Sequence, residues 1–284
     1  MAETSQMQSS RNYAQAFGRG VYTDILRWGD SETLTSLCRR NRFDIGDTYL
    51  NCLHRFYKSM KCNYRCEYVF KNEIIADLRH HYAGHKTLVV NEFRVGNSIA
   101  DLAFFNGESR AYEIKTSFDS PRRLMSQMNS YRRVFDKCYL VVERDEVEDW
   151  LHYDDNMGII AFSHGSRGGV RLDEFRHAKL NKCLDAETIM SCLRAEEYEW
   201  IAMHYANMEL TSPKYKHFEE CTRILKKMNY ELLHKAFLET IELRKSDFDI
   251  LKYTPRELYQ VCLSMHLTEN QLDIITNSLK NKII

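Results

Sequence analysis

The stretch Asn97–Tyr131 (NSIADLAFFNGESRAYEIKTSFDSPRRLMSQMNSY) constrains the fold of this chain more than any other part of the sequence. Apolar and charged residues alternate in YEIKT, which places Glu113 and Lys115 on one face of a strand. A second apolar run precedes this strand, and residues 106–108, which are typical of a turn, separate the two runs. After Ser120 the apolar spacing becomes helical. We therefore expect a hairpin of two short strands followed by a helix.

This hairpin predicts a cluster of charged side chains, provided that its loop has the right length. Asp101 lies in the first strand, and it shares the face of Glu113 only if it stands opposite an odd-numbered residue. A loop of odd length around residues 106–108 achieves this, whereas a two-residue Asn-Gly turn would not. Three-residue loops with glycine in the left-handed region are common. We therefore predict an odd loop, with Asp101, Glu113 and Lys115 on one face.

The helix that follows has clear start signals and one polar residue in its apolar stripe. Ser120 is a favourable N-cap, and Pro121 suits the first helical position. The stripe consists of Leu124, Gln127, Met128, Tyr131 and Phe135. A glutamine in such a stripe needs hydrogen-bond partners, and we expect the neighbouring charged cluster to supply them.

The residue types in the cluster indicate chemistry with a hard divalent cation. An acid beside a lysine on a buried strand face is costly unless something compensates. Carboxylates of Asp101 and Glu113, a main-chain carbonyl at Ile114 and waters would suit Mg²⁺ or Mn²⁺. The metal would polarise a phosphoryl oxygen and activate water, while Lys115 would hold that water or offset negative charge. The alternative is an ordinary solvated hairpin face, because D-x11-E-x-K alone also arises by chance. The helical Q-x3-Y and the upstream helical acid Glu73 favour the phosphodiester-cleaving site.

These motifs resemble the PD-(D/E)XK nuclease superfamily, which has the restriction-endonuclease-like fold. QMNSY is similar to the Q-x3-Y of RecB-type members, and EIKTSFDSPRRLMSQMNSYRRVFDKCYLVV looks closer still to an uncharacterised bacterial branch. In that branch D-S-x-x-R-L, Q-x3-Y and V-F-D follow the lysine. Here these are Asp119, Ser120, Arg123, Leu124, Gln127, Tyr131, Val134, Phe135 and Asp136. The resemblance covers about Asn72 to Val142. Ala100 stands where the superfamily's name has proline, which many members lack.

The resemblance implies a mixed α/β sheet flanked by helices and metal-dependent cleavage of nucleic acid. The implied site residues are Asp101 and Glu113 as metal ligands, Lys115 as catalytic lysine, Gln127 and Tyr131 as a supporting pair, and Glu73 as the first-helix acid. DNA is favoured over RNA as substrate, with a bacterial defence or mobile-element role by family analogy. A homodimer also fits this class of enzyme. The alternative is a non-catalytic nucleic-acid-binding or adaptor protein that keeps the fold.

The elements along the chain predict three regions. Residues 1–60 are expected to form a disordered start, up to Ser10, and a helical preface. Residues 61–178 contain the predicted nuclease core, with a helix at Asn72–Tyr82 and strands at Thr87–Val95, Lys137–Glu143 and Met157–Phe162. Residues 179–284 are expected to be a helical region large enough to dock a protein partner. HGSRGG, after the last of these strands, predicts a plain turn rather than a phosphate loop.

Composition adds little to the choice of function. The 40 Lys and Arg residues balance the 40 Asp and Glu residues, so net charge gives no nucleic-acid signature. The region between Arg11 and Lys71 is more basic, with 11 basic and 6 acidic residues, although ordinary solvated helices explain this equally well. Nine cysteines form no CxxC pair and there is no signal peptide, which predicts a reducing cytoplasm. No apolar run is long enough to predict a membrane span.

Overall fold

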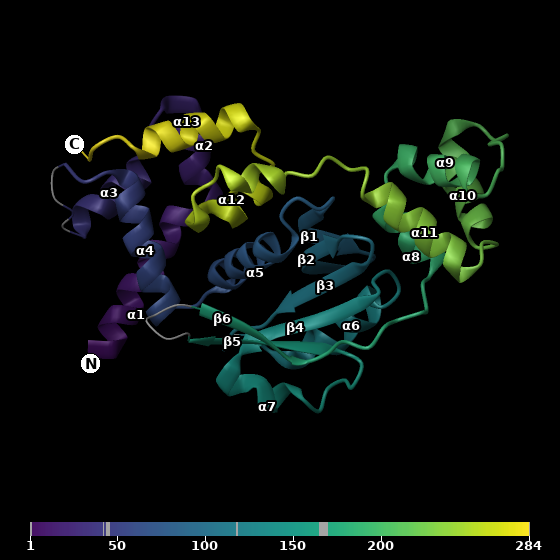
Figure 1. Cartoon of the computed structure of the whole chain (residues 1–284), viewed down its shortest axis with the longest axis horizontal. Coiled ribbons are helices and arrows are strands. Elements are labelled where there is room, and N and C mark those ends of the chain that lie inside the picture. The colour runs from purple at the N-terminus through teal and green to yellow at the C-terminus, as the bar shows by residue number, and fades with distance from the viewer. Residues whose placement is uncertain (1, 42, 44–45, 118, 165–169, 284) are drawn as a thin grey trace. The chain divides into compact units, whose positions relative to one another are not determined.

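The structure is a computed structural model that describes residues 2–41, 43, 46–117, 119–164 and 170–283 of the 284-residue chain. The predicted fold class is confirmed: a mixed sheet is flanked by helices, with helical regions at both ends of the chain (Figure 1). The chain divides into two compact units. Unit 1 comprises Met1–Gly84, Phe162–Leu172 and Asp247–Ile284, and unit 2 comprises His85–Ala161 and Asp173–Ser246. The sequence-based division after residues 60 and 178 follows different boundaries.

Six strands of the described chain form one sheet in the order β1-β2-β3-β4-β5-β6. Their bounds are β1 Leu88–Val95, β2 Ser98–Phe105, β3 Ser109–Ile114, β4 Lys137–Glu143, β5 Gly158–His164 and β6 Val170–Arg176. β1 and β2 are antiparallel, as are β2 and β3, whereas β3 and β4 are parallel. The parallel pair needs a crossover connection, and the predicted helix provides it.

The loop between β2 and β3 confirms the predicted parity. Phe105 stands opposite Ser109, so the loop contains Asn106, Gly107 and Glu108, and Gly107 has a φ of +66°. Glycine tolerates this left-handed conformation because it has no Cβ atom. The Gly107 amide donates to Glu242 Oε1 at 2.7 Å. An odd loop therefore sets the register of the hairpin.

Unit 2 packs its later helices onto the sheet around one hydrophobic core. Its helical elements are η2 Pro121–Arg123, α6 Leu124–Tyr131, η3 Arg144–Glu146, α7 Val147–Trp150, α8 Ala186–Cys192, α9 Ala195–His204, η5 Lys214–Lys216, α10 His217–Leu225 and α11 Tyr230–Ile241. Phe105 on β2 meets Phe237 on α11, with ring centroids 6.1 Å apart. The residues 186–241 therefore share a core with the strands.

Unit 1 brings the first and last helices of the chain together. Its elements are α1 Ala2–Tyr13, η1 Ala14–Phe17, α2 Arg19–Trp28, α3 Glu32–Arg40, α4 Tyr49–Asn63, α5 Glu67–Tyr82, η6 Asp249–Lys252, η7 Arg256–Leu258, α12 Tyr259–Ser264 and α13 Glu269–Leu279. The Ser278 hydroxyl on α13 donates to the Gly29 carbonyl after α2, at 2.6 Å. Thr268 caps α13 through a capping box with Gln271. The C-terminal helices are thus divided between the two units.

The prediction of a disordered start is wrong, because α1 begins at Ala2. Its last turn has partners on α4 that the local sequence does not reveal. The Ser10 hydroxyl lies 3.0 Å from the Ser59 hydroxyl, and the Tyr13 ring stacks on Phe56 with centroids 4.4 Å apart. These tertiary contacts stabilise a helix whose composition is small and polar.

Two further sequence expectations can be compared with the described residues, and a third falls mostly outside them. No helix among them is both long and apolar enough to cross a membrane. All nine cysteines are free thiols. The HGSRGG turn lies almost entirely outside the described part of the chain, which omits residues 165–169.

Candidate functional site

Glu113 and Lys115 form a buried ion pair at the end of β3. Glu113 is 3% exposed and Lys115 is 7% exposed. Lys115 Nζ lies 2.6 Å from Glu113 Oε1. The Lys115 amide donates to the Val141 carbonyl of β4 at 2.9 Å, so strand pairing continues just past Ile114 and holds both side chains on one face. The predicted acid–lysine pair is therefore formed and desolvated.

Asp101 is held at this end of β3 by a main-chain hydrogen bond. The β2–β3 ladder ends at Leu102 opposite Tyr112, and one further step in the same register places Asp101 opposite Glu113. Asp101 Oδ2 accepts the Ile114 amide at 2.7 Å. The amide and carbonyl of one strand residue point to the same side, so the Ile114 carbonyl also faces β2. Asp101 thus binds the peptide group between Glu113 and Ile114.

A strained residue lies level with Asp101 on the other neighbouring strand. The β1–β2 register includes Asn91 opposite Leu102 and Phe93 opposite Ala100, but it skips Glu92. Glu92 is exposed and has a φ of +56°, a conformation that side-chain-bearing residues rarely adopt. The ladder is therefore interrupted beside Asp101 on this strand. The alternation of TLVVNEFRV gives no signal of this irregularity.

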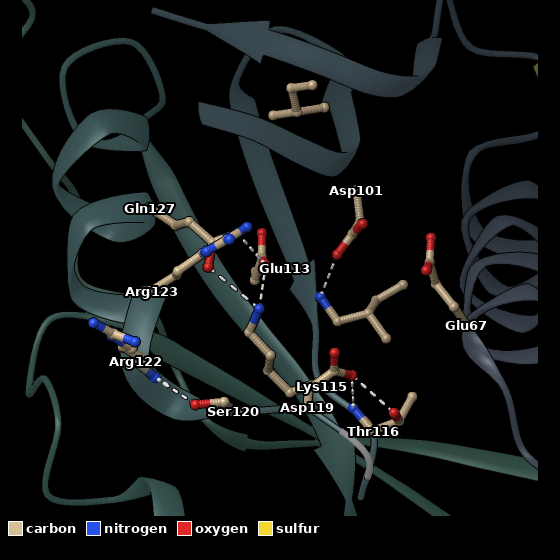
Figure 2. A network of polar contacts seen from close by, with 12 residues as sticks. Glu67, Asp101, Glu113, Lys115, Thr116, Asp119, Ser120, Arg122, Arg123 and Gln127 are labelled. Carbon is tan, nitrogen blue, oxygen red and sulfur yellow. Dashed lines mark hydrogen bonds and ion pairs between the residues drawn. The ribbon is translucent and has the colours of Figure 1, made fainter. Parts of the chain in front are cut away.

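Helix α6 supplies two further partners of Glu113. The Ser120 hydroxyl accepts the Arg122 amide at 3.3 Å with Pro121 at the first position of η2, which leads into α6, so the predicted N-cap is confirmed. Gln127 Nε2 donates to Glu113 Oε1 at 2.6 Å, and Lys115 Nζ donates to Gln127 Oε1 at 3.2 Å (Figure 2). The glutamine in the apolar stripe therefore has the hydrogen bonds that we expect.

Tyr131, one turn after Gln127, completes the cluster. Its hydroxyl lies 2.6 Å from Glu113 Oε2 and 2.7 Å from the Ile99 carbonyl oxygen, and both of these atoms are acceptors. Burial and the nearby Glu113 charge raise the pKa of Tyr131 well above its ordinary value. Tyr131 thus stays protonated and donates. Both oxygens of Glu113 are fixed by residues of one short segment.

The turn after Lys115 is built by Asp119. Its Oδ2 accepts both the amide and the hydroxyl of Thr116 at 2.8 Å, and its own amide donates to the Thr116 carbonyl. A pocket of about 240 Å³ opens beside this turn. The pocket is lined by Thr116, Ser117, Asp119, Pro121, Glu146, Asp149, Trp150 and Tyr153. Its acidic lining makes this side of the turn unfavourable for phosphate groups.

Asp136, the last residue of the V-F-D motif, belongs to a second buried cluster of unit 2. Its Oδ2 accepts the amide and the hydroxyl of Ser109, at 2.8 and 3.0 Å. Its Oδ1 lies 2.8 Å from His234 Nε2 on α11. Asp136 thus ties the start of β3 to a later helix. These contacts give the acid at position 136 a role in the stability of the fold.

Glu73 lies on α5 in unit 1, where it has partners of its own. It is 3% exposed. The Tyr57 hydroxyl donates to Oε1 at 2.7 Å, Arg256 donates to Oε2 at 2.8 Å, and Lys61 Nζ lies 3.6 Å from Oε1. These contacts compensate a buried carboxylate. The metal-ligand role that the resemblance implies for Glu73 stays a prediction.

The oxygen groups of the site fit a magnesium-type ion by their chemistry. Among the residues that the structure describes, no three His, Cys, Asp or Glu side chains are grouped to hold a metal. Mg²⁺, however, is usually bound through only one or two carboxylates and keeps several waters. Asp101, Glu113 and the Ile114 carbonyl match such a donor set.

The fold and the site together define a mixed α/β protein whose sheet carries a buried Glu–Lys–Gln–Tyr cluster beside an aspartate. A family model described as "Bacteriophage P4 protein cII" matches residues 60–257, which is more than half of the chain. The chain belongs to this family. The matched residues include Glu73 and the whole segment from Asp101 to Tyr131.

Two individual proteins show more limited similarity. Protein cII of Enterobacteria phage P4 is 34% identical over 77 residues. The chain spans only 26% of that protein's length, and the match covers 26% of this chain. The solved structure of SPO1766, a protein of unknown function from Silicibacter pomeroyi, covers 50% of this chain and 94% of its own at 14% identity, with a TM-score of 0.32. This score is too low to inform the fold or function of the chain.

Proposed function

We propose that this protein is a Mg²⁺-dependent nuclease that hydrolyses phosphodiester bonds, with DNA as its main substrate. One observation carries the proposal: the Asp101 carboxylate binds the Ile114 amide, which lies between the buried Glu113 and Lys115 positions. Two acids and a lysine thus converge at one strand end. The motif resemblance to the PD-(D/E)XK superfamily supports the same conclusion.

In this proposal each group has a separate role. Asp101, Glu113 and the Ile114 carbonyl hold the metal, which when bound polarises the phosphate and acidifies a water. Lys115 orients the attacking water and stabilises negative charge at the phosphate. Gln127 and Tyr131 are positioning residues, because they fix the two oxygens of Glu113.

A cleavage assay tests the proposal. Plasmid, linear and single-stranded DNA and RNA would be incubated with Mg²⁺, Mn²⁺ or EDTA. Asp101→Asn is a sharp variant, because the amide oxygen can still accept from Ile114 while the charge is lost. Lys115→Met is matched by Lys137→Met, since Lys137 lies on the neighbouring strand β4 and also pairs with a glutamate, Glu108, at 2.9 Å.

The expected result is metal-dependent cleavage that Asp101→Asn and Lys115→Met each reduce by about 10³-fold, the size of a main electrostatic contribution. Lys137→Met should retain cleavage. A folded wild-type protein that binds DNA but cuts no substrate with either metal would contradict the proposal. In that case the non-catalytic binding or adaptor function would be favoured.

A further inference from the structure

Arg123 is the last residue of η2 and the N-cap of α6, the helix that carries Gln127 and Tyr131. The backbone of Arg123 is in the right-handed helical region, and Arg123, Gln127 and Tyr131 are spaced four residues apart, so their side chains project from one side of this segment. Gln127 and Tyr131 both bind Glu113. In Figure 2 the Arg123 side chain extends toward the part of the view that holds Glu113, whereas the Arg122 side chain points the other way. Arg123 is therefore the outermost member of a row directed at the site.

The guanidinium groups of Arg122 and Arg123 are available to a ligand. Both residues are exposed. Within the described part of the chain, neither side chain has a hydrogen-bond or ion-pair partner. A cation at a helix start is unfavourable by about 0.3–1 kcal/mol, because the helix dipole is positive there. Helix stability thus gives no reason for two arginines at this position.

The charges around the site differ between its two sides, and they favour a phosphate on one side only. Asp101, Glu113 and Lys115 leave a net negative charge, which repels a phosphodiester unless other cations approach it. On the turn side, Asp119, Glu146 and Asp149 line the acidic pocket. On the Gln127 side, Arg123 offers a planar fork that suits two oxygens of one phosphate.

We infer that Arg123 binds a backbone phosphate of the nucleic acid on the Gln127 side of the site, and that Arg122 does not. The inference rests on the proposed function for its substrate class. Arg123 is then a substrate-binding residue rather than part of the support for Glu113. It would contribute equally to binding of any base sequence, since phosphates carry no sequence information.

The test measures binding separately from cleavage. A fluorescein-labelled duplex DNA would be titrated in EDTA at several salt concentrations with wild type, Arg123→Ala, Arg123→Lys and the matched control Arg122→Ala. Arg123→Ala should weaken binding about tenfold and lower the slope of log K against log salt by about one. Arg123→Lys should restore the slope but not the full affinity, and Arg122→Ala should stay within about twofold of wild type.

Each outcome separates this inference from the proposed function. Equal effects of the two alanine variants, an unchanged Arg123→Ala protein or a wild type that does not bind DNA would overturn the role of Arg123. If the separate cleavage assay then shows Mg²⁺-dependent cleavage, the proposed function stands alone. If binding depends on Arg123 but no metal supports cleavage, the phosphate contact stands and the nuclease proposal fails.

Discussion

Glu113 and Glu73 are two equally buried glutamates with similar partners and different surroundings. Each is 3% exposed, and each receives a tyrosine hydroxyl: Tyr131 at 2.6 Å for Glu113 and Tyr57 at 2.7 Å for Glu73. Each also has a cation, Lys115 at 2.6 Å and Arg256 at 2.8 Å. A buried, compensated carboxylate is therefore not by itself evidence of a functional site.

The difference lies in what the partners join. The side-chain partners of Glu113 come from one segment that ends at Tyr131, and Asp101 binds the adjacent peptide. The partners of Glu73 come from α4 and from η7, 183 residues away from Glu73 in the sequence. We therefore propose that Glu73 links distant helices of unit 1, whereas Glu113 takes part in the proposed cleavage reaction as a metal ligand.

The largest expected effect comes from replacing each glutamate by its uncharged isostere. Glu113→Gln should lower the rate of DNA cleavage by about 10³-fold, because it removes the proposed metal ligand. Glu73→Gln should lower thermal stability, and its cleavage rate per folded molecule should match wild type. Cleavage assays with protein quantified by circular dichroism decide this. Equal loss of activity in both variants would place both glutamates in one site and break the comparison.

The two tyrosines provide a matched pair with a smaller effect. Tyr131→Phe and Tyr57→Phe each remove a hydrogen bond to a buried carboxylate, so each should lower the free energy of unfolding by about 1.5–3 kcal/mol. Only Tyr131→Phe should also reduce cleavage, by about tenfold, because it releases one oxygen of Glu113. Urea denaturation and steady-state kinetics measure the two effects. Reduced cleavage in Tyr57→Phe alone would reverse the assignment.

Metal binding at the Glu113 site should stabilise the protein, and this gain should not depend on Glu73. At a Mg²⁺ concentration tenfold above its dissociation constant, wild type should gain about 1.4 kcal/mol, a rise of about 2–4 °C in Tm. Thermal melts with Mg²⁺ and with EDTA measure this gain. Asp101→Asn should abolish it, and Glu73→Gln should retain it. A shift that depends on Glu73 and not on Asp101 would locate the ion elsewhere.

The sequence predicts the Glu113 cluster well because its partners are local. Strand parity and helical spacing are enough to bring Glu113, Lys115, Gln127 and Tyr131 together, and the odd hairpin loop follows from the need to include Asp101. The α/β core follows from alternating strands and helices, whereas the mixed sheet is what the motif resemblance implies. No local period, however, links Glu73 to Arg256.

The same limit explains what the sequence misses. The last turn of α1 has contacts of Ser10 and Tyr13 with Ser59 and Phe56, which belong to another helix. The division of the C-terminal helices between the units depends on which core each helix joins, and amphipathic spacing does not specify that partner. The positive φ of Glu92 has no compositional signal, since glycine or asparagine would be the usual residue there.

A third buried carboxylate sharpens the comparison, because its cation is titratable. Asp136 is 2% exposed and pairs with His234, whose ring also stacks on Tyr230. The Asp136 carboxylate, 2.8 Å away, raises the pKa of His234 above its ordinary value of 6.5. The protonated pair should therefore stabilise the fold fully below about pH 6.5 and lose this contribution as pH rises through the raised pKa.

The expected loss is the smallest of these effects, about 1 kcal/mol in the free energy of unfolding between about pH 6 and 8. Urea denaturation across this range measures it. His234→Gln should flatten the dependence, because glutamine does not titrate, whereas Glu73→Gln should leave it unchanged because Arg256 stays charged throughout. An equally steep profile in His234→Gln would show that another group titrates. A flat profile in the wild-type protein would mean that the charge of Asp136, like that of Glu73, is compensated independently of pH.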